Sequence, residues 1–171
     1  MKRLVPTGFT LIELMVVLAI LGIVALLAAP SFNTFLARSK LRGAAHETLA
    51  DLQYARSESV QKNQVFRVEF SSTGYEIWRM SRTAPTTKDA ATAGLPNPVK
   101  VGLWGVSGTV ASSGASMAVN FNPVRATATV SDGPLELSHA AISGTLRLLV
   151  NTSGRVELCS PGASIRGIAA C

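Results

Sequence analysis

The chain has 171 residues, enough for one domain with a hydrophobic core, and 47% of them are hydrophobic. Its formal net charge of +6 falls to +4 without the leader cations Lys2 and Arg3, and is +5 when Glu13 of the apolar segment is also left out. This moderate charge suits an anionic partner, DNA or a lipid surface, without specifying either. His46 and His139 stand in unrelated contexts, where we expect solvated surface residues, so the composition predicts neither a metal centre nor an enzyme.

A short basic leader ends at Gly8, and an almost wholly apolar segment follows it. Phe9 to Leu36 contains Glu13 as its only charge, and these 28 residues span ~42 Å as a helix, enough to cross a ~30 Å hydrocarbon core. A charged side chain in a membrane segment costs about 2.5–3.5 kcal/mol even on the mildest scale. Glu13 is therefore a candidate functional residue.

Three other interpretations of this segment compete with a functional role for Glu13. An ordinary secretory signal also joins a basic start to an apolar stretch of about 7–15 residues, and Leu26 to Ala29 is a poor small-residue cleavage site. That interpretation leaves Glu13 unexplained. A plain single-span anchor agrees with the segment as far as it goes, whereas a buried helix of a soluble protein fails on length and continuity.

We expect the helix to continue past the apolar segment. Gly22 and Pro30 interrupt the apolar part, and proline usually kinks a helix because it removes an i→i−4 hydrogen bond. From Ser31 onward small and apolar residues recur at three- and four-residue steps, while charges occupy mostly other faces, and Asn63 marks the end. The apolar stripe comprises Leu41, Ala45, Leu49, Leu52, Ala55 and Ser59, and the charged positions are Arg42, Glu47, Asp51, Arg56, Glu58 and Lys62.

Strand patterns follow the helix. Gln64 to Phe70 alternates, and the turn from Ser71 to Gly74 joins it as a hairpin to Tyr75–Met80. Ser81 to Pro98 is typical of a long surface loop. Later strands are expected at Val99–Trp104, Met117–Phe121, Leu135–Ser138, Thr145–Val150 and Arg155–Cys159, with a turn at Asn151–Gly154. A helix followed by strands predicts an α+β fold, with an antiparallel sheet against one helix.

The chain has two cysteines, Cys159 and Cys171, close together at the C-terminus. In a chain that leaves the cytoplasm, a lone close pair favours a disulfide over a metal site, and two free thiols are the alternative. The positive-inside rule does not set the orientation, because basic residues flank both ends of the apolar segment: Lys2, Arg3, Arg38, Lys40 and Arg42. The cysteine pair, together with the family resemblance given below, places the C-terminal part outside the cytoplasm.

The succession of basic leader, Gly8, Phe9 and Glu13 resembles the class III signal of type IV prepilins and pseudopilins. The resemblance implies that a prepilin peptidase cuts after Gly8 and that the new N-terminal residue, Phe9, is N-methylated. It implies that Glu13 pairs with the terminal amine of a neighbouring subunit during assembly. It also implies that the stretch from Gly22 to Pro30 can lose helicity in a filament.

The rest of the chain resembles the GspH/FimT family of minor pseudopilins. The likeness is carried by Leu52-Gln53-Tyr54-Ala55-Arg56-Ser57-Glu58, by Phe121-Asn122-Pro123 and by Leu148 to Val156. It implies a type IV pilin-like ladle, a long helix packed on an antiparallel β-sheet domain. The expected parts are a leader over 1–8, a transmembrane and assembly helix over 9–37, its amphipathic continuation over 38–63 and a β-rich domain over 64–171.

The resemblance implies a structural subunit that helps initiate or cap a type IV pilus or a type II secretion pseudopilus. Its expected partners are other pilins or pseudopilins, prepilin peptidase and the bacterial inner membrane, which it crosses once with the C-terminal domain in the periplasm. No cofactor is expected. The sequence does not separate the pilus from the secretion pseudopilus, because the assembly physics is shared.

A DNA-binding tip pilin for natural transformation is the alternative function. DNA-binding members of the FimT type carry Gly-Arg-x-Arg near the C-terminus, whereas this chain has Gly154-Arg155-Val156-Glu157. Phosphate contacts rely on cationic donors, so Glu157 opposes them. Arg155 and Arg166 are the candidate DNA contacts, and we expect any binding to be weak; a solvated Arg155 after a turn glycine explains the pattern equally well.

Overall fold

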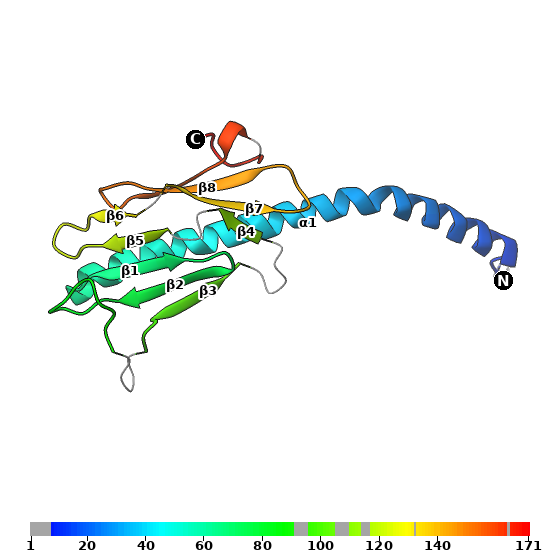
Figure 1. The fold of residues 1–171 in the computed structure, drawn as a ribbon. Helices are drawn as coiled ribbons and strands as arrows, with labels where there is room; N and C mark the ends of the chain where they lie inside the picture. Colours follow the sequence, from blue (N-terminus) through cyan, green and yellow to red (C-terminus); the bar gives the residue numbers. More distant parts are fainter. Residues whose placement is uncertain (1–7, 91–95, 105–109, 114–116, 132, 164) are drawn as a thin grey trace, which may run out of the picture. The chain divides into compact units, whose positions relative to one another are not determined.

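In the residues that the computed structural model describes, one long helix precedes a series of short strands (Figure 1). The helix α1 runs over Leu11–Lys62. The strands are β1 Phe66–Phe70, β2 Gly74–Arg79, β3 Lys100–Leu103, β4 Val110–Ser113, β5 Ala118–Phe121, β6 Ala128–Val130, β7 Leu135–His139, β8 Thr145–Val150 and β9 Val156–Cys159, followed by the 3-10 helix η1 Pro161–Ala163. The described residues are 8–90, 96–104, 110–113, 117–131, 133–163 and 165–171.

The chain divides into two units, Met1–Leu36 and Ala37–Cys171, and the boundary falls within α1. In the first unit, the described side chains from Phe9 to Leu36 are exposed on every side of the helix. A helix that is apolar all round belongs in a membrane or in a protein core. Of the described helices, none alone has the length and hydropathy to cross a membrane, but the bent pair Leu11–Leu27 and Ser31–Lys62 meets both requirements together.

A capping contact marks the start of α1, and a left-handed residue marks its end. The Thr10 Oγ1 accepts a hydrogen bond from the backbone N–H of Glu13 at 3.3 Å, so Thr10 caps the first turn. Asn63 has a φ of 47°, a left-handed conformation that asparagine tolerates and that ends helices. The helix therefore ends where the sequence predicts, and it passes through Gly22 without a break.

Two antiparallel sheets lie in the second unit, with strand orders β3-β2-β1-β5-β6 and β4-β7-β8-β9. The sequence pattern predicts seven of these strands within two residues at each end, and it does not predict β4 and β6. Both have weak signals, because β4 reads Val-Ala-Ser-Ser and β6 has only 3 residues. Two sheets form in place of the single sheet expected, because β4, β7, β8 and β9 pair with one another and not with the strands of the first sheet.

Both predicted hairpins are confirmed. In the first, Phe66 pairs with Arg79 and Phe70 with Tyr75, which turns Phe66, Val68 and Phe70 into the core. In the second, β8 and β9 pair from Val150 and Val156 outward across the turn Asn151–Gly154.

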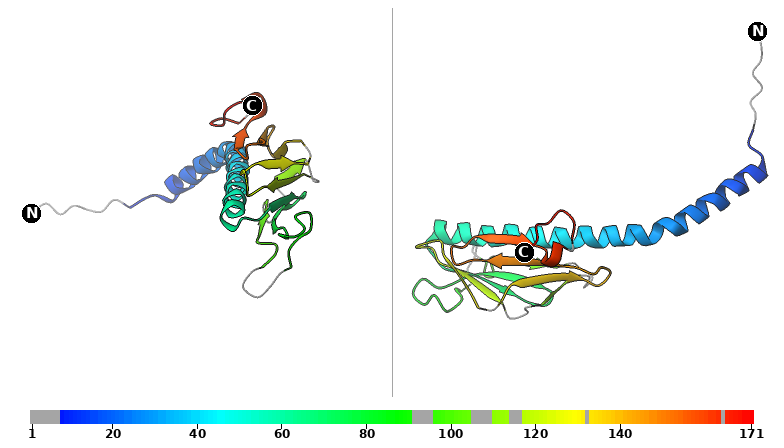
Figure 2. Two further views of the ribbon diagram at one scale, coloured as in Figure 1. Left: turned by 90° about the vertical axis from the view of Figure 1, so that its left-hand side faces the viewer. Right: turned by 90° about the horizontal axis from the view of Figure 1, so that it is seen from above.

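The part of α1 that belongs to the second unit packs along both sheets (Figure 2). Its buried side chains include those of the predicted apolar stripe, with Leu49 half-buried: Leu41, Ala45, Leu52, Ala55 and Ser59. Ala37, Thr48 and Asp51 are buried as well. The apolar side chains of the stripe meet Phe66, Val68 and Ile77 of the first sheet and Leu135, Leu137, Leu146 and Leu148 of the second. The amphipathic pattern of the sequence thus predicts this packing correctly.

Two polar residues that the sequence places in solvent are buried instead. Asp51 is 5% exposed, because it lies three residues after Thr48 and four before Ala55 on the buried stripe. It accepts hydrogen bonds from the Tyr75 hydroxyl at 2.7 Å and from Lys100 Nζ at 2.6 Å. His139 is 8% exposed at the end of β7, where its Nδ1 accepts a hydrogen bond from the backbone N–H of Ala141.

The contacts of Asp51 join α1 to β2 and β3. Burial raises the pKa of the Tyr75 hydroxyl above its ordinary range, and the hydrogen bond to Asp51 raises it further, so Tyr75 remains a neutral donor. The hydrogen bond to Asp51 raises the pKa of Lys100. One turn of α1 earlier, Thr48 accepts a hydrogen bond from Trp104 Nε1 at 3.0 Å.

A disulfide joins Cys159, the last residue of β9, to Cys171. Because it closes a short loop, we expect that replacing both cysteines with serine lowers the free energy of unfolding by ~3 kcal/mol in the chain-entropy model. Chemical denaturation of the oxidised protein and of the double variant measures this difference. Labelling of two thiols per chain in unreduced, denatured protein would contradict the bridge.

Candidate functional site

The residues of the expected cleavage site precede α1. Gly8 and Phe9 lie outside the helix, and Phe9 is 85% exposed. A peptide bond outside regular structure is accessible to a peptidase without unfolding of a helix. Glu13 follows in the first turn of α1, with its backbone N–H on the capping Thr10. A carboxylate there also faces the positive end of the helix dipole.

Gly22 has no packing reason within the described chain to be glycine. A Cβ built on it meets nothing within 4 Å, and the helix is continuous there. The residue is therefore left open to contacts with other molecules or to the loss of helicity that the resemblance implies. The structure describes the backbone of Pro30, and α1 includes it.

Two of the residues that carry the family resemblance, Arg56 and Gly154, have a structural role at the C-terminal hairpin. Gly154 is buried with a φ of 73°, and a Cβ there would press on the backbone oxygen of Ala126 and on Arg56. Arg56 of α1 donates a hydrogen bond from Nη2 to the Ser153 oxygen at 3.0 Å. Arg56 and Gly154 therefore hold the β8–β9 turn against the helix.

The two candidate DNA contacts are both exposed, but the structure does not bring them together. Arg155 forms an ion pair with Glu157, with 3.1 Å between Nε and Oε1. Their side chains are 73% and 51% exposed, so the pair is a surface contact that neutralises the hairpin locally. Arg166 lies in the loop closed by the disulfide, and among the described contacts none joins it to Arg155.

The charge of this hairpin yields a prediction. We expect Glu157→Arg to tighten binding of duplex DNA, because it frees Arg155 and adds a cation where a carboxylate stands, and Arg155→Ala to weaken it. Both effects should shrink as salt rises, since phosphate contacts release counterions. Titration of labelled duplex at two salt concentrations measures them. Equal binding by the wild type and Glu157→Arg means that the hairpin is not a DNA site.

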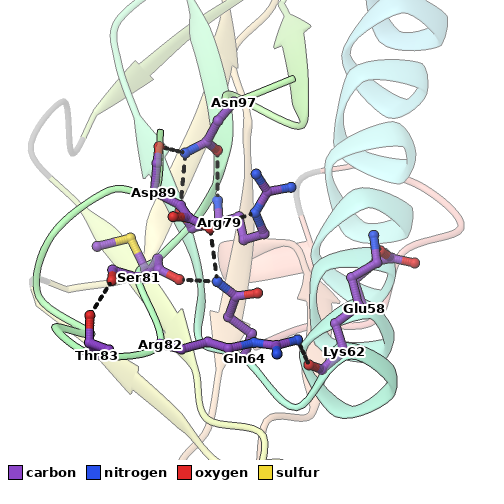
Figure 3. Close-up of polar contacts among 10 residues, drawn as sticks. Glu58, Lys62, Gln64, Arg79, Ser81, Arg82, Thr83, Asp89 and Asn97 are labelled. Carbon is purple, nitrogen blue, oxygen red and sulfur yellow. Dashed lines mark hydrogen bonds and ion pairs between the residues drawn. The ribbon is translucent and has the colours of Figure 1, made fainter. Parts of the chain in front are cut away.

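An open cavity of about 460 Å³, lined mostly by charged and polar residues, lies at the end of α1, and no pattern in the sequence predicts it (Figure 3). Its lining includes Lys62 from the end of α1, Gln64, Arg79 from β2, and Ser81, Arg82 and Asp89 from the loop that follows. These residues are scattered in the sequence, and the segment after β2 resembles an ordinary surface loop. One signal was available: Arg79 occupies an inward position of β2, in step with Tyr75 and Ile77.

Among the described residues, no three His, Cys, Asp or Glu side chains gather in a way that could hold a metal ion. The candidate sites in the described residues are an exposed N-terminal segment, a packed hairpin and a cationic cavity.

Comparison with known proteins identifies the family. The family model described as Type II transport protein GspH matches residues 44–164, from the amphipathic half of α1 to the disulfide loop. The chain belongs to the GspH family. A second model, described as the prokaryotic N-terminal methylation motif, matches residues 7–29, which include Gly8, Phe9 and Glu13.

Several known proteins are similar to this GspH-family chain. A fimbrial protein of Dichelobacter nodosus is 37% identical over 115 residues, which cover 61% of this chain and 69% of that protein. Fimbrial protein EcpC of Eikenella corrodens is 51% identical over 41 residues, so this chain spans only 27% of its length. The crystal structure of the type IV minor pilin FimU of Pseudomonas aeruginosa has the same fold, with a TM-score of 0.50 at 21% identity over 74% of this chain and 96% of that one.

Membership of the GspH family confirms the resemblance and the pilin-like α+β fold, a long N-terminal helix packed on antiparallel sheets. The chain is a minor pilin or pseudopilin that carries the N-terminal methylation motif, with a general role in pili or secretion. It is a structural protein and not an enzyme, as the sequence predicts.

Proposed function

We propose that prepilin peptidase cuts this chain between Gly8 and Phe9, and that the mature protein helps initiate or cap a type IV pilus or a type II secretion pseudopilus. The observation that carries the proposal is the N-terminal half of α1. Its described side chains are mostly apolar and exposed on all sides, and Glu13 is its only charge up to Leu36. Such a surface needs lipid before assembly and neighbouring helices after it.

In this proposal each part of the chain has its own task. Residues 1–8 are a leader that is removed, and residues 9–37 anchor the precursor in the bacterial inner membrane and later pack among other pilins. Residues 38–63 continue the helix, and residues 64–171 form the β-rich domain, exposed in the periplasm. The disulfide between Cys159 and Cys171 supports an oxidising compartment for that domain.

Glu13 is assigned to assembly. After cleavage, the methylated amine of Phe9 is a cation, and a neighbouring Glu13 is the only carboxylate in the apolar segment that can neutralise it. Burial of both charges among apolar helices is tolerable only when they pair. Gly22 and Pro30 would allow the helix between them to adjust to its neighbours.

The experiment that tests this function is recovery of the protein in sheared filaments. Cells that express the chain with the pilus machinery, and in parallel with the type II secretion machinery, are sheared, and the filament fraction is probed for it. The proposal expects the mature chain in one of the two fractions and its loss when prepilin peptidase is deleted. Absence from both fractions of cells that assemble normal filaments would overturn it.

A further inference from the structure

Arg79 is a buried cation whose donors are only partly used. Its side chain is 7% exposed, and its Nε donates to Asp89 Oδ2 at 3.1 Å. No hydrogen bond joins its two terminal nitrogens to any described residue, and they carry no contact to the other residues drawn in Figure 3. A guanidinium keeps its charge and offers five N–H donors. The terminal nitrogens of Arg79 are not among the fully buried unpaired atoms of the described residues, so they reach solvent and are available to an acceptor that enters the cavity. These donors line the cavity at the end of α1.

The walls of this cavity are predominantly cationic. Among its described lining residues, Lys62, Arg79 and Arg82 face a single carboxylate, Asp89. Lys62 also pairs with Glu58 at 2.6 Å, and Arg82 donates from Nη2 to the Lys62 oxygen at 3.1 Å. The cations therefore exceed the carboxylates even when Glu58 is counted.

Asp89 accepts a hydrogen bond from only one nitrogen of Arg79, Nε. Its Oδ2 accepts from Arg79 Nε and, at 3.2 Å, from Gln64 Nε2. These hydrogen bonds, that of Arg79 first, hold the pKa of Asp89 below its ordinary value, so it is a fixed negative charge in the wall. Gln64 is itself buried and donates to the Met80 oxygen, which holds the carboxamide in place.

We propose that this cavity binds the carboxylate of an acidic peptide segment of a partner protein, through the terminal nitrogens of Arg79. The planar fork of a guanidinium matches a carboxylate in a bidentate manner. When Glu58 is counted, three cations against two carboxylates leave one positive charge, which a singly charged carboxylate neutralises and a phosphate of about −1.5 to −2 exceeds. The cavity volume of about 460 Å³ lies in the range of ligand pockets and admits a whole acidic side chain.

This site lies wholly in the unit Ala37–Cys171 and uses none of the residues assigned to membrane anchoring or assembly. Its test is therefore independent of whether the chain enters a filament. Loss of carboxylate binding would leave the proposed function intact, and absence from filaments would leave the cavity intact.

The experiment is a titration of the full chain, in zwitterionic detergent micelles at low salt, with a fluorescent hexaglutamate peptide. We expect saturable binding that Arg79→Gln weakens by about tenfold or more, as expected for loss of charge-assisted hydrogen bonds. Arg82→Gln, an exposed position, should also weaken binding and covers the case in which Arg79→Gln fails to fold. Lys40→Gln, an exposed cation of α1 outside the cavity, should bind as the wild type does.

The contradicting outcomes are equally definite. Equal weakening by Lys40→Gln would show that net charge alone attracts the peptide, and equal affinity of all four proteins would exclude the cavity. Displacement of the peptide by inorganic phosphate at concentrations where glutarate has no effect would overturn the carboxylate assignment. Duplex DNA that binds through Arg79 and Arg82 while the peptide does not would replace the proposal with a nucleic-acid site.

Discussion

Glu13→Ala is expected to leave the protein in the membrane at normal levels and to remove most of it from filaments. The apolar segment becomes more hydrophobic without the carboxylate, so insertion is easier. In the filament, the amine of Phe9 from a neighbouring subunit would be buried without its partner, and loss of one member of a buried ion pair costs about 3–5 kcal/mol. Immunodetection in membrane and sheared-filament fractions measures both effects.

Two control variants separate this pairing from other roles of Glu13. Thr10→Ala removes the cap of α1, at a cost of about 1 kcal/mol, but keeps the carboxylate. Glu47→Ala removes an exposed carboxylate of α1 outside the apolar segment. Both should reach filaments far better than Glu13→Ala. Normal incorporation of Glu13→Ala, or a defect of equal size in Thr10→Ala, would contradict the pairing.

Asp51→Ala is expected to lower the free energy of unfolding by about 2–3 kcal/mol, because the Tyr75 hydroxyl would stay buried without an acceptor. Lys100 adds little to this figure, since its side chain is 45% exposed and regains water. Chemical denaturation of the variant and the wild type measures the change.

Tyr75→Phe tests the same contact from the other side. It removes the donor and leaves Asp51 paired with Lys100, so we expect a loss of about 1 kcal/mol. The double variant should lose less stability than the sum of the two single losses, because both substitutions remove the same hydrogen bond. Additive losses would show that the hydroxyl and the carboxylate contribute independently.

The elements that the sequence predicts best are those with strong local periodicity. Two patterns predict the buried faces correctly: the alternation of Phe66, Val68 and Phe70, and the three- and four-residue spacing from Leu41 to Ala55. In a regular helix or strand the spacing of residues along the sequence determines which of them share a face. Asn63 is predicted as the end of the helix because its left-handed tolerance is an intrinsic property.

The residues that the sequence misplaces depend on partners far along the chain. Asp51 is buried because Tyr75 and Lys100 from the first sheet reach it, and no local pattern announces those contacts. Arg79 enters a cavity wall because a loop returns Asp89 to it. The short strand β6 has too few residues to specify a strand by its own pattern. It forms because it pairs with the edge of β5.

The central claim is that the mature protein begins at Phe9, so that it keeps the whole apolar segment and loses only the leader. Intact-mass analysis of the protein purified from membranes of cells with an active prepilin peptidase tests it most directly. We expect a chain that begins at Phe9 and carries one methyl group on its N-terminal amine, together with an intact disulfide. A mature chain that begins near Ala29 would contradict the account, because the apolar segment would then be a discarded secretory signal.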